Sequence, residues 1–146
     1  MQFFRQADAD VSTIVGWGVR VMLLSQAEVA TDSNVAVRIA GLGGAIEMER
    51  EAFAAIDALI HHPTGYALFV IECDAFGGLE AGRALVSLLH KGGVSMPVML
   101  VSSDCQKQEF PNDYNGSVVL RAPVSAVGLR VGFEHALRDR LVFQAA

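Results

Sequence analysis

In residues 66–89, YALFVIECDAFGGLEAGRALVSLL, a strand, a turn and a helix follow one another. The first six residues are apolar at every position, which is typical of a strand covered by helices on both faces. After a turn with Gly77 and Gly78, apolar or small residues recur at helical spacing between positions 82 and 89. This order of elements indicates an α/β protein with a parallel sheet.

Similar patterns on both sides of this stretch extend the prediction to a complete domain. Further strands are expected at 20–24, 45–49, 97–101 and 117–120. The alternation AIEME at 45–49 favours a half-exposed strand at an edge of the sheet, whereas the apolar run at 21–24 favours a central one. Helices are expected at 28–42, around 53–60, around 82–89 and at 125–143. Because Pro111 and the NDYNG cluster interrupt 104–116, one short helical turn and a loop are expected there.

The composition narrows the class of protein. The chain has 146 residues, 52% of them hydrophobic, which suits one domain with its own core. Its net charge of −5 disfavours nucleic acid as a partner, since it would repel phosphates. No apolar run approaches the roughly 20 residues that a membrane span needs, so no membrane role is expected. Two cysteines are too few for a disulfide scaffold and indicate a reducing compartment, the cytoplasm.

The first 18 residues are predicted to be separate from the main domain. Residues 1–18 precede the first strand as an extension, and residues 19–146 form the main domain. In the extension Phe4, Ala7, Val11 and Ile14 lie three or four positions apart, as in an amphipathic helix. Its apolar face would be covered either by the core of the same chain or by a second copy.

The carboxyl ends of the strands are where a doubly wound sheet binds ligands. Hydroxyl, amide and acidic side chains follow three of the predicted strands, and an X-Pro step follows the fifth. The candidate site residues are Ser25, Gln26, Glu72, Asp74, Ser102, Ala122 and Pro123.

Three stretches, YALFVIE followed by the turn GGLEAG, MPVMLVSS, and VVLRAPVS, make roughly residues 19–142 similar to the receiver domain of two-component response regulators. The resemblance implies a flavodoxin-like three-layer sandwich: a five-stranded parallel sheet of order 2-1-3-4-5 with five flanking helices. It also implies phosphoryl transfer from a histidine kinase to an aspartate that ends the third strand. An acidic pair that holds Mg²⁺, a Ser or Thr, and a Lys before a proline complete the family's site.

Carried over by position, most of these residues are absent. The acidic pair falls on Ser25 and Gln26, and neither is the anionic ligand that Mg²⁺ prefers. The acceptor falls on Glu72 if YALFVIE is aligned, or on Asp74 if the next aspartate is aligned. Ser102 matches the hydroxyl position, whereas the lysine position before Pro123 holds Ala122.

In place of that lysine, the neighbouring Arg121 is expected to point to the opposite face of the strand. These departures predict a receiver-like regulatory module that is not an enzyme, has no cofactor or metal, and acts through protein partners without phosphorylation. Homodimerisation is expected through the last helix, the N-terminal segment, or both.

Two alternatives remain open for the same site. One is an active, atypical response regulator phosphorylated on Asp74, or at the Glu72 position, which would then need Mg²⁺. The other is a flavodoxin-like domain that binds a small ligand through Ser25, Ser102 and Ser103.

Cysteines and histidines outside this set have simpler interpretations. Cys73 and Cys105 are expected to be small buried residues, with a redox pair as the alternative. The adjacent His61 and His62 are expected to be solvated at a helix end.

Overall fold

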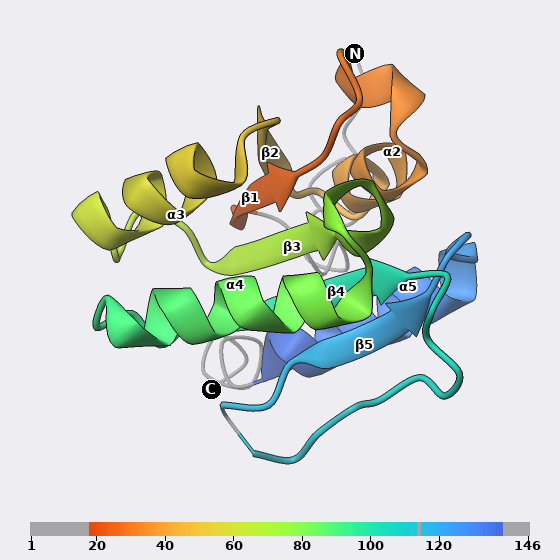
Figure 1. The fold of residues 1–146 in the computed structure, drawn as a ribbon. Coiled ribbons are helices and arrows are strands. Elements are labelled where there is room, and N and C mark those ends of the chain that lie inside the picture. Colours follow the sequence, from red (N-terminus) through yellow and green to blue (C-terminus); the bar gives the residue numbers. More distant parts are fainter. Residues whose placement is uncertain (1–17, 114, 139–146) are drawn as a thin grey trace, which may run out of the picture.

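The computed structural model describes residues 18–113 and 115–138 (Figure 1). Five strands form one sheet in the order β2-β1-β3-β4-β5, and every neighbouring pair is parallel. The predicted flavodoxin-like α/β fold and its strand order are confirmed. The strands are β1 (Arg20–Leu24), β2 (Ala45–Glu49), β3 (Leu68–Glu72), β4 (Val98–Ser102) and β5 (Val118–Arg121).

Helices cover both faces of the sheet (Figure 1). One face packs against α2 and α5, which also contact each other, and the other face packs against α3 and α4. The described residues contain four α-helices, whereas the family resemblance implies five. They are α2 (Asn34–Gly41), α3 (Ala52–His61), α4 (Leu79–Lys91) and α5 (Ala126–Ala136), with short 3-10 turns η1 (Ala30–Asp32) and η2 (Cys73–Phe76).

Alternate side chains of the central strands enter two separate cores. On β1, Val21 and Leu23 join the cluster under α2 and α5, whereas Met22 and Leu24 join the cluster under α3 and α4. Both sets are fully buried, which explains why this strand is apolar at successive positions. In contrast, β2 pairs only with β1 among the described strands and is partly exposed along its length, as predicted for an edge.

The predicted helix at 28–42 begins later than expected. Residues Ala30–Asp32 form η1, and the α-helix starts at Asn34 after Ser33. The Ser33 side chain accepts a hydrogen bond from the backbone N–H of Ala36 (3.0 Å), so it caps the helix. This cap ends the preceding loop and places a serine at the carboxyl edge of the sheet.

The segment between β4 and β5 also differs from the prediction. Within its described residues the segment 104–116 contains no helix, and its start is a hydrogen-bonded turn from the N–H of Cys105 to the oxygen of Ser102 (3.3 Å). Instead, Glu109 forms an antiparallel bridge with Val119 through two backbone hydrogen bonds of 2.9 and 3.0 Å. The segment thereby occupies hydrogen-bonding groups of β5 on the side away from β4, where an unpaired strand edge would otherwise be exposed.

Two further predictions concern the ends of the chain. The helix predicted at 125–143 is observed as Ala126–Ala136, and residues 139–146 lie outside the described part. The helix predicted for residues 1–18 lies, except for Gly18, outside it as well. Among the described residues, no helix has the length and apolar character needed to cross a bilayer.

Candidate functional site

Polar side chains gather at the carboxyl edge of the sheet. Ser25, Ser33 and Ser102 are the buried polar residues of the described chain, and all three lie at this edge. Ser25 follows β1, Ser33 precedes α2, and Ser102 ends β4. Buried hydroxyls need hydrogen-bond partners, and here they find carboxylates.

The first group, which we call the Glu72 cluster, consists of Ser25, Ser33 and Glu72. The Ser25 hydroxyl donates to Oε1 of Glu72 (2.5 Å), and the Ser33 hydroxyl donates to Oε2 (2.7 Å). Each hydroxyl also accepts a backbone N–H, from Ala27 (3.1 Å) and Ala36 (3.0 Å) respectively. Because the backbone occupies the acceptor side of each hydroxyl, its proton is directed to the carboxylate. Both oxygens of Glu72 therefore have a serine partner.

The second group, which we call the Asp74 cluster, consists of Asp74, Ser102 and Ser103. The Ser102 hydroxyl donates to Oδ1 of Asp74 (2.8 Å), and the backbone N–H of Ser103 lies 3.0 Å from both carboxylate oxygens. Partial burial acts to raise the pKa of Asp74, but the hydrogen bonds from Ser102 and Ser103 outweigh it and lower that pKa overall. Asp74 is therefore an anion at neutral pH.

The remaining predicted site residues divide into two sets. Ala122 and Pro123 lie beside the carboxylates and line the same pocket. Gln26 instead donates from Nε2 to the backbone oxygen of Arg50 (2.7 Å), beside β2. Arg121 donates from Nε to the oxygen of Cys105 (2.9 Å) and from its terminal nitrogen to that of Gln106, so it does not replace the missing lysine.

Sequence reasoning missed Ser33, which supplies half of the hydrogen bonds to the Glu72 carboxylate. A local signal was available, since Ser33 and Asn34 are residue types that favour the start of a helix. Placing the helix start at 28 put Ser33 inside the helix. Its contact with Glu72 joins positions 39 residues apart, and no local pattern reports such a contact.

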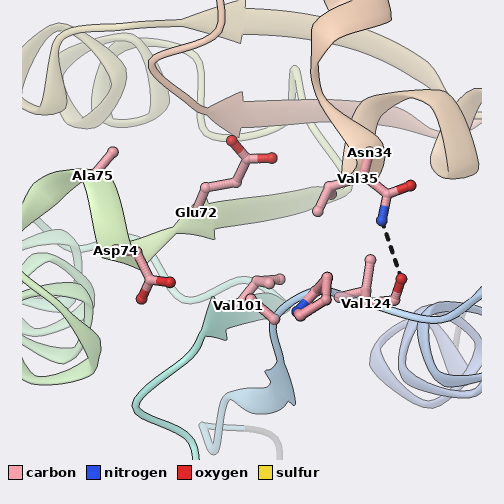
Figure 2. A pocket seen from close by; sticks show the side chains of 9 residues that line it. Asn34, Val35, Glu72, Asp74, Ala75, Val101 and Val124 are labelled. Atoms are coloured by element: carbon pink, nitrogen blue, oxygen red, sulfur yellow. Dashed lines mark hydrogen bonds between the residues drawn. The ribbon is translucent and has the colours of Figure 1, made fainter.

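A pocket of about 250 Å³ lies among these elements (Figure 2). Figure 2 shows Glu72 and Asp74 on the β3 side of the pocket and Val124 on the β5 side. The Asn34 amide donates to the Val124 oxygen (3.0 Å) and links α2 to the loop before α5. The nine lining residues include two carboxylates and no cation: Asn34, Val35, Glu72, Asp74, Ala75, Val101, Ala122, Pro123 and Val124.

The donor atoms at this edge do not fit Mg²⁺. Magnesium prefers near-octahedral coordination by hard oxygen ligands, usually including carboxylates. Here the two positions after β1 are Ser25 and Gln26, and neither supplies a carboxylate. The part of the chain that the structure describes contains no group of three or more His, Cys, Asp or Glu side chains placed to hold a metal.

The cysteines and histidines behave as the simpler interpretation predicted. Cys73 and Cys105 are buried free thiols. Burial raises the pKa of Cys73 to about 12, so its thiol stays protonated and unreactive at neutral pH. His61 and His62 are exposed at the end of α3.

No protein-family model matches the chain, and no curated protein shows significant similarity to it. The function is therefore argued from the residues at the carboxyl edge of the sheet.

Proposed function

We propose that this protein is a regulatory module of signal transduction that resembles a response-regulator receiver and acts through protein partners without being phosphorylated. The observation that carries the proposal is the Glu72 cluster. At the end of β3, where the family resemblance expects a phosphoryl acceptor beside a metal, a carboxylate accepts hydrogen bonds from Ser25 and Ser33.

The chemistry of phosphoryl transfer supports the same interpretation. The transferred group carries negative charge that must be neutralised by metal ions or by Lys and Arg side chains. Ser25 and Gln26 supply no charge, Ala122 supplies none, and the guanidinium of Arg121 is bonded to backbone oxygens elsewhere. A phosphoryl group on Asp74 would add charge to a pocket that already holds the Glu72 carboxylate.

Exposed apolar residues on α5 supply a surface for a partner. Val127 and Val131 are 73% and 45% exposed, and they lie one helical turn apart on the same side of the helix. On the adjacent α2, Val37 is also half-exposed. We propose that this surface pairs with a second copy of the chain, and that the free thiols of Cys73 and Cys105 reflect a cytoplasmic location.

Intact-mass analysis after incubation with acetyl phosphate and Mg²⁺ tests the central proposal, with an active receiver domain treated in parallel as the control for the phosphodonor. We expect no mass change, and no shift in melting temperature with beryllofluoride. A gain of one phosphoryl group would overturn the proposal in favour of an active regulator. Asp74→Asn and Glu72→Gln would then show which carboxylate accepts the group.

The pocket favours a second candidate, a domain that binds a small ligand at the same edge. Its mixture of apolar walls and a few polar groups is typical of ligand sites. Thermal-shift measurements against a panel of small metabolites test this candidate, because a ligand specific for the folded state raises the melting temperature.

Light scattering coupled to size-exclusion chromatography tests the proposed dimer. We expect a dimer that Val131→Asp converts to a monomer, since the charge would be buried in the interface. Phe53→Asp is the matched control, because Phe53 is 68% exposed on α3, on the opposite face of the sheet. A monomer at high concentration, or equal dissociation by both variants, would contradict this assembly.

A further inference from the structure

Several carboxylates of the described chain contact a basic side chain, whereas Glu72 and Asp74, like Glu49 and Asp104, accept hydrogen bonds from neutral donors. Ion pairs of 3.2 Å join Glu47 to Arg20, Glu109 to Arg83 and Glu134 to Arg130, and Asp57 lies 3.2 Å from the imidazole of His61. Within residues 18–113 and 115–138, Glu72 and Asp74 have hydroxyl and N–H partners, and none of the residues that line their pocket is Lys or Arg. The pocket therefore holds two carboxylates without a matching cation.

Hydrogen-bonding capacity remains on both carboxylates. A carboxylate has about four lone-pair sites on its two oxygens. The oxygens of Glu72 accept one serine hydroxyl each, and those of Asp74 accept Ser102 and the N–H of Ser103. Glu72 therefore keeps a free lone pair on each oxygen, and Asp74 keeps one on Oδ2, for a donor that arrives from outside.

The rest of the pocket fits an aliphatic chain. Val35, Val101, Ala122 and Val124 supply apolar wall, and the small Ala122 occupies the position at which the family resemblance expects a lysine. The volume of about 250 Å³ lies just below the roughly 300–1,000 Å³ of pockets for drug-sized ligands, so it suits a smaller molecule or a single side chain. An apolar wall with charge at one side suits one long side chain that carries a cation.

We propose that this pocket receives an arginine side chain presented by a partner protein, an inference that rests on the proposed interaction function. The methylene groups of the arginine pack on the valines and Ala122, and its guanidinium lies against Glu72 and Asp74. Arginine fits better than lysine because its planar group carries five donors in a fixed fork and reaches two carboxylates on different elements. The partner thus supplies the positive charge that the chain lacks at Ala122.

The test is a titration of the ¹⁵N-labelled 146-residue chain, followed by the amide signals in two-dimensional NMR. The probe is the peptide acetyl-Gly-Arg-Gly-amide, and its control contains citrulline, which has nearly the same shape as arginine but no charge. We expect the arginine peptide to shift the amides of Ala75, Val101 and Val124, with little effect from the citrulline peptide.

Two variants connect the binding to the pocket. Asp74→Asn removes one charge with little change of shape and is expected to weaken binding about two- to five-fold, the range for a partly exposed ion pair. Ala122→Lys places a cation of the chain itself in the pocket and is expected to abolish binding. Asp57→Asn, which removes the same charge from the exposed surface of α3, should leave binding unchanged.

Three results would overturn the arginine proposal: equal binding of the citrulline peptide, no shifts around the pocket, or equal affinity of Asp74→Asn and the unmodified protein. If the mass stays unchanged with acetyl phosphate in the same preparation, such a result contradicts only the choice of arginine. A phosphoryl adduct would instead contradict the proposed function, whatever the peptide does.

Discussion

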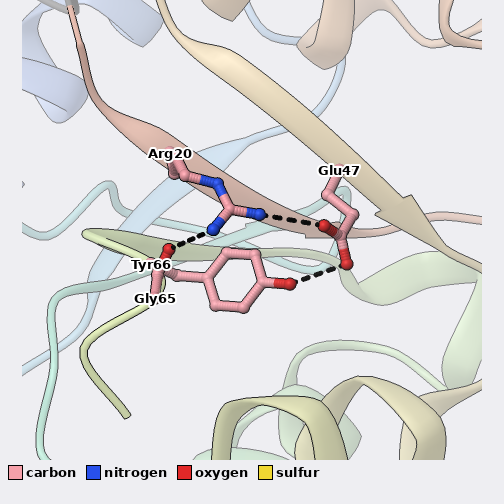
Figure 3. A network of polar contacts seen from close by, with 4 residues as sticks. All are labelled: Arg20, Glu47, Gly65 and Tyr66. Carbon is pink, nitrogen blue, oxygen red and sulfur yellow. Dashed lines mark hydrogen bonds and ion pairs between the residues drawn. The ribbon is translucent and has the colours of Figure 1, made fainter. Parts of the chain in front are cut away.

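The carboxylates at the two ends of the sheet have different kinds of partner. Near the amino-terminal ends of β1 and β3, Glu47 faces the guanidinium of Arg20 (3.2 Å) and accepts the hydroxyl of Tyr66 (2.6 Å) (Figure 3). Arg20 also donates to the backbone oxygen of Gly65 (3.0 Å) and lies 4.7 Å from the centre of the Tyr66 ring. At the carboxyl end, the donors to Glu72 and Asp74 that the described part of the chain supplies are all neutral. The negative charge of Glu47 is thus paired with a cation, whereas the negative charges of Glu72 and Asp74 are available to a cation from outside.

The polar groups at the two ends also differ in burial. The buried serines at the carboxyl end are therefore expected to contribute more to stability than the exposed ion pair at the other end. The side chains of Arg20 and Glu47 are 56% and 50% exposed, and exposed ion pairs contribute little because water already solvates both charges. Ser25 and Ser33 are buried, so a lost partner there costs the desolvation of a polar group. We expect the neutral serines to stabilise the fold more than the formal ion pair does.

The largest expected effect is that of Ser33→Ala. This change removes a helix N-cap and a hydrogen bond to a carboxylate, which together should lower the free energy of unfolding by about 2–3 kcal/mol. Ser125→Ala is the matched control, because Ser125 caps α5 through the N–H of Gly128 (2.9 Å) and no bond to a carboxylate is seen for it in the described residues. Its cost should be about 1 kcal/mol. Urea unfolding measures both, and equal losses would show that the bond to Glu72 adds nothing.

A smaller effect is expected at the opposite end of the sheet. A double-mutant cycle with Arg20→Gln and Glu47→Gln should give a coupling energy of about 0.2–1 kcal/mol, because both side chains are exposed. The coupling should decrease further in 1 M salt. A coupling above that of Ser33 with Glu72, measured in the same way, would reverse the comparison between the two ends.

The titration of Asp74 tests the electrostatics of the carboxyl end. Its pKa is lower in the folded protein than in the unfolded chain, so the folded state favours the anion. Asp74 therefore adds stability that is present above its unfolded pKa of about 3.9 and is lost as the pH falls through the folded pKa. In Ser102→Ala, NMR should show the pKa of Asp74 moving upward. An unchanged pKa would show that this hydroxyl does not hold the charge.

The smallest effect is expected for Tyr66. The hydrogen bond to Glu47 raises the pKa of Tyr66, and burial and the charge of Glu47 add to the shift. The folded state thus favours the neutral phenol, and the resulting stability is present below the unfolded pKa of about 10 and lost as the pH rises through the folded value. Absorbance titration should show Tyr66 ionising at lower pH in Glu47→Gln. No change would mean that Glu47 does not control this phenol.

Particular elements show which parts of the fold could be predicted from the sequence. The apolar runs at 21–24 and 68–71 identified two central strands, because side chains on both faces of a covered strand must be apolar. The alternation at 45–49 identified the edge strand in the same way. The predicted start of α2 was wrong, because capping by Ser33 outweighed the apolar residues before it.

The prediction for residues 104–116 was wrong for a different reason. Pro111 correctly predicted an interruption, but whether the residues before it form a helical turn or an extended strand depends on what they pack against. Here Glu109 pairs with Val119, a partner that the local sequence does not identify.

The candidate site was predicted as a location rather than as a set of contacts. The rule that parallel strands bind ligands at their carboxyl ends brought Ser25, Glu72, Asp74 and Ser102 to one edge. That these residues divide into two clusters was not predicted, and Gln26 proved to face the backbone of Arg50 instead.

The sequence by itself determined the strands, the central and edge positions, and the absence of a lysine before Pro123, because these follow from burial along one element or from residue identity. The tertiary structure alone decided that Ser25 and Ser33 both donate to Glu72, across 47 and 39 positions of the chain. Such contacts depend on strand order and on where each loop returns to the sheet. Periodicity reports how one element faces its core, and it carries no information on which loops meet at the edge.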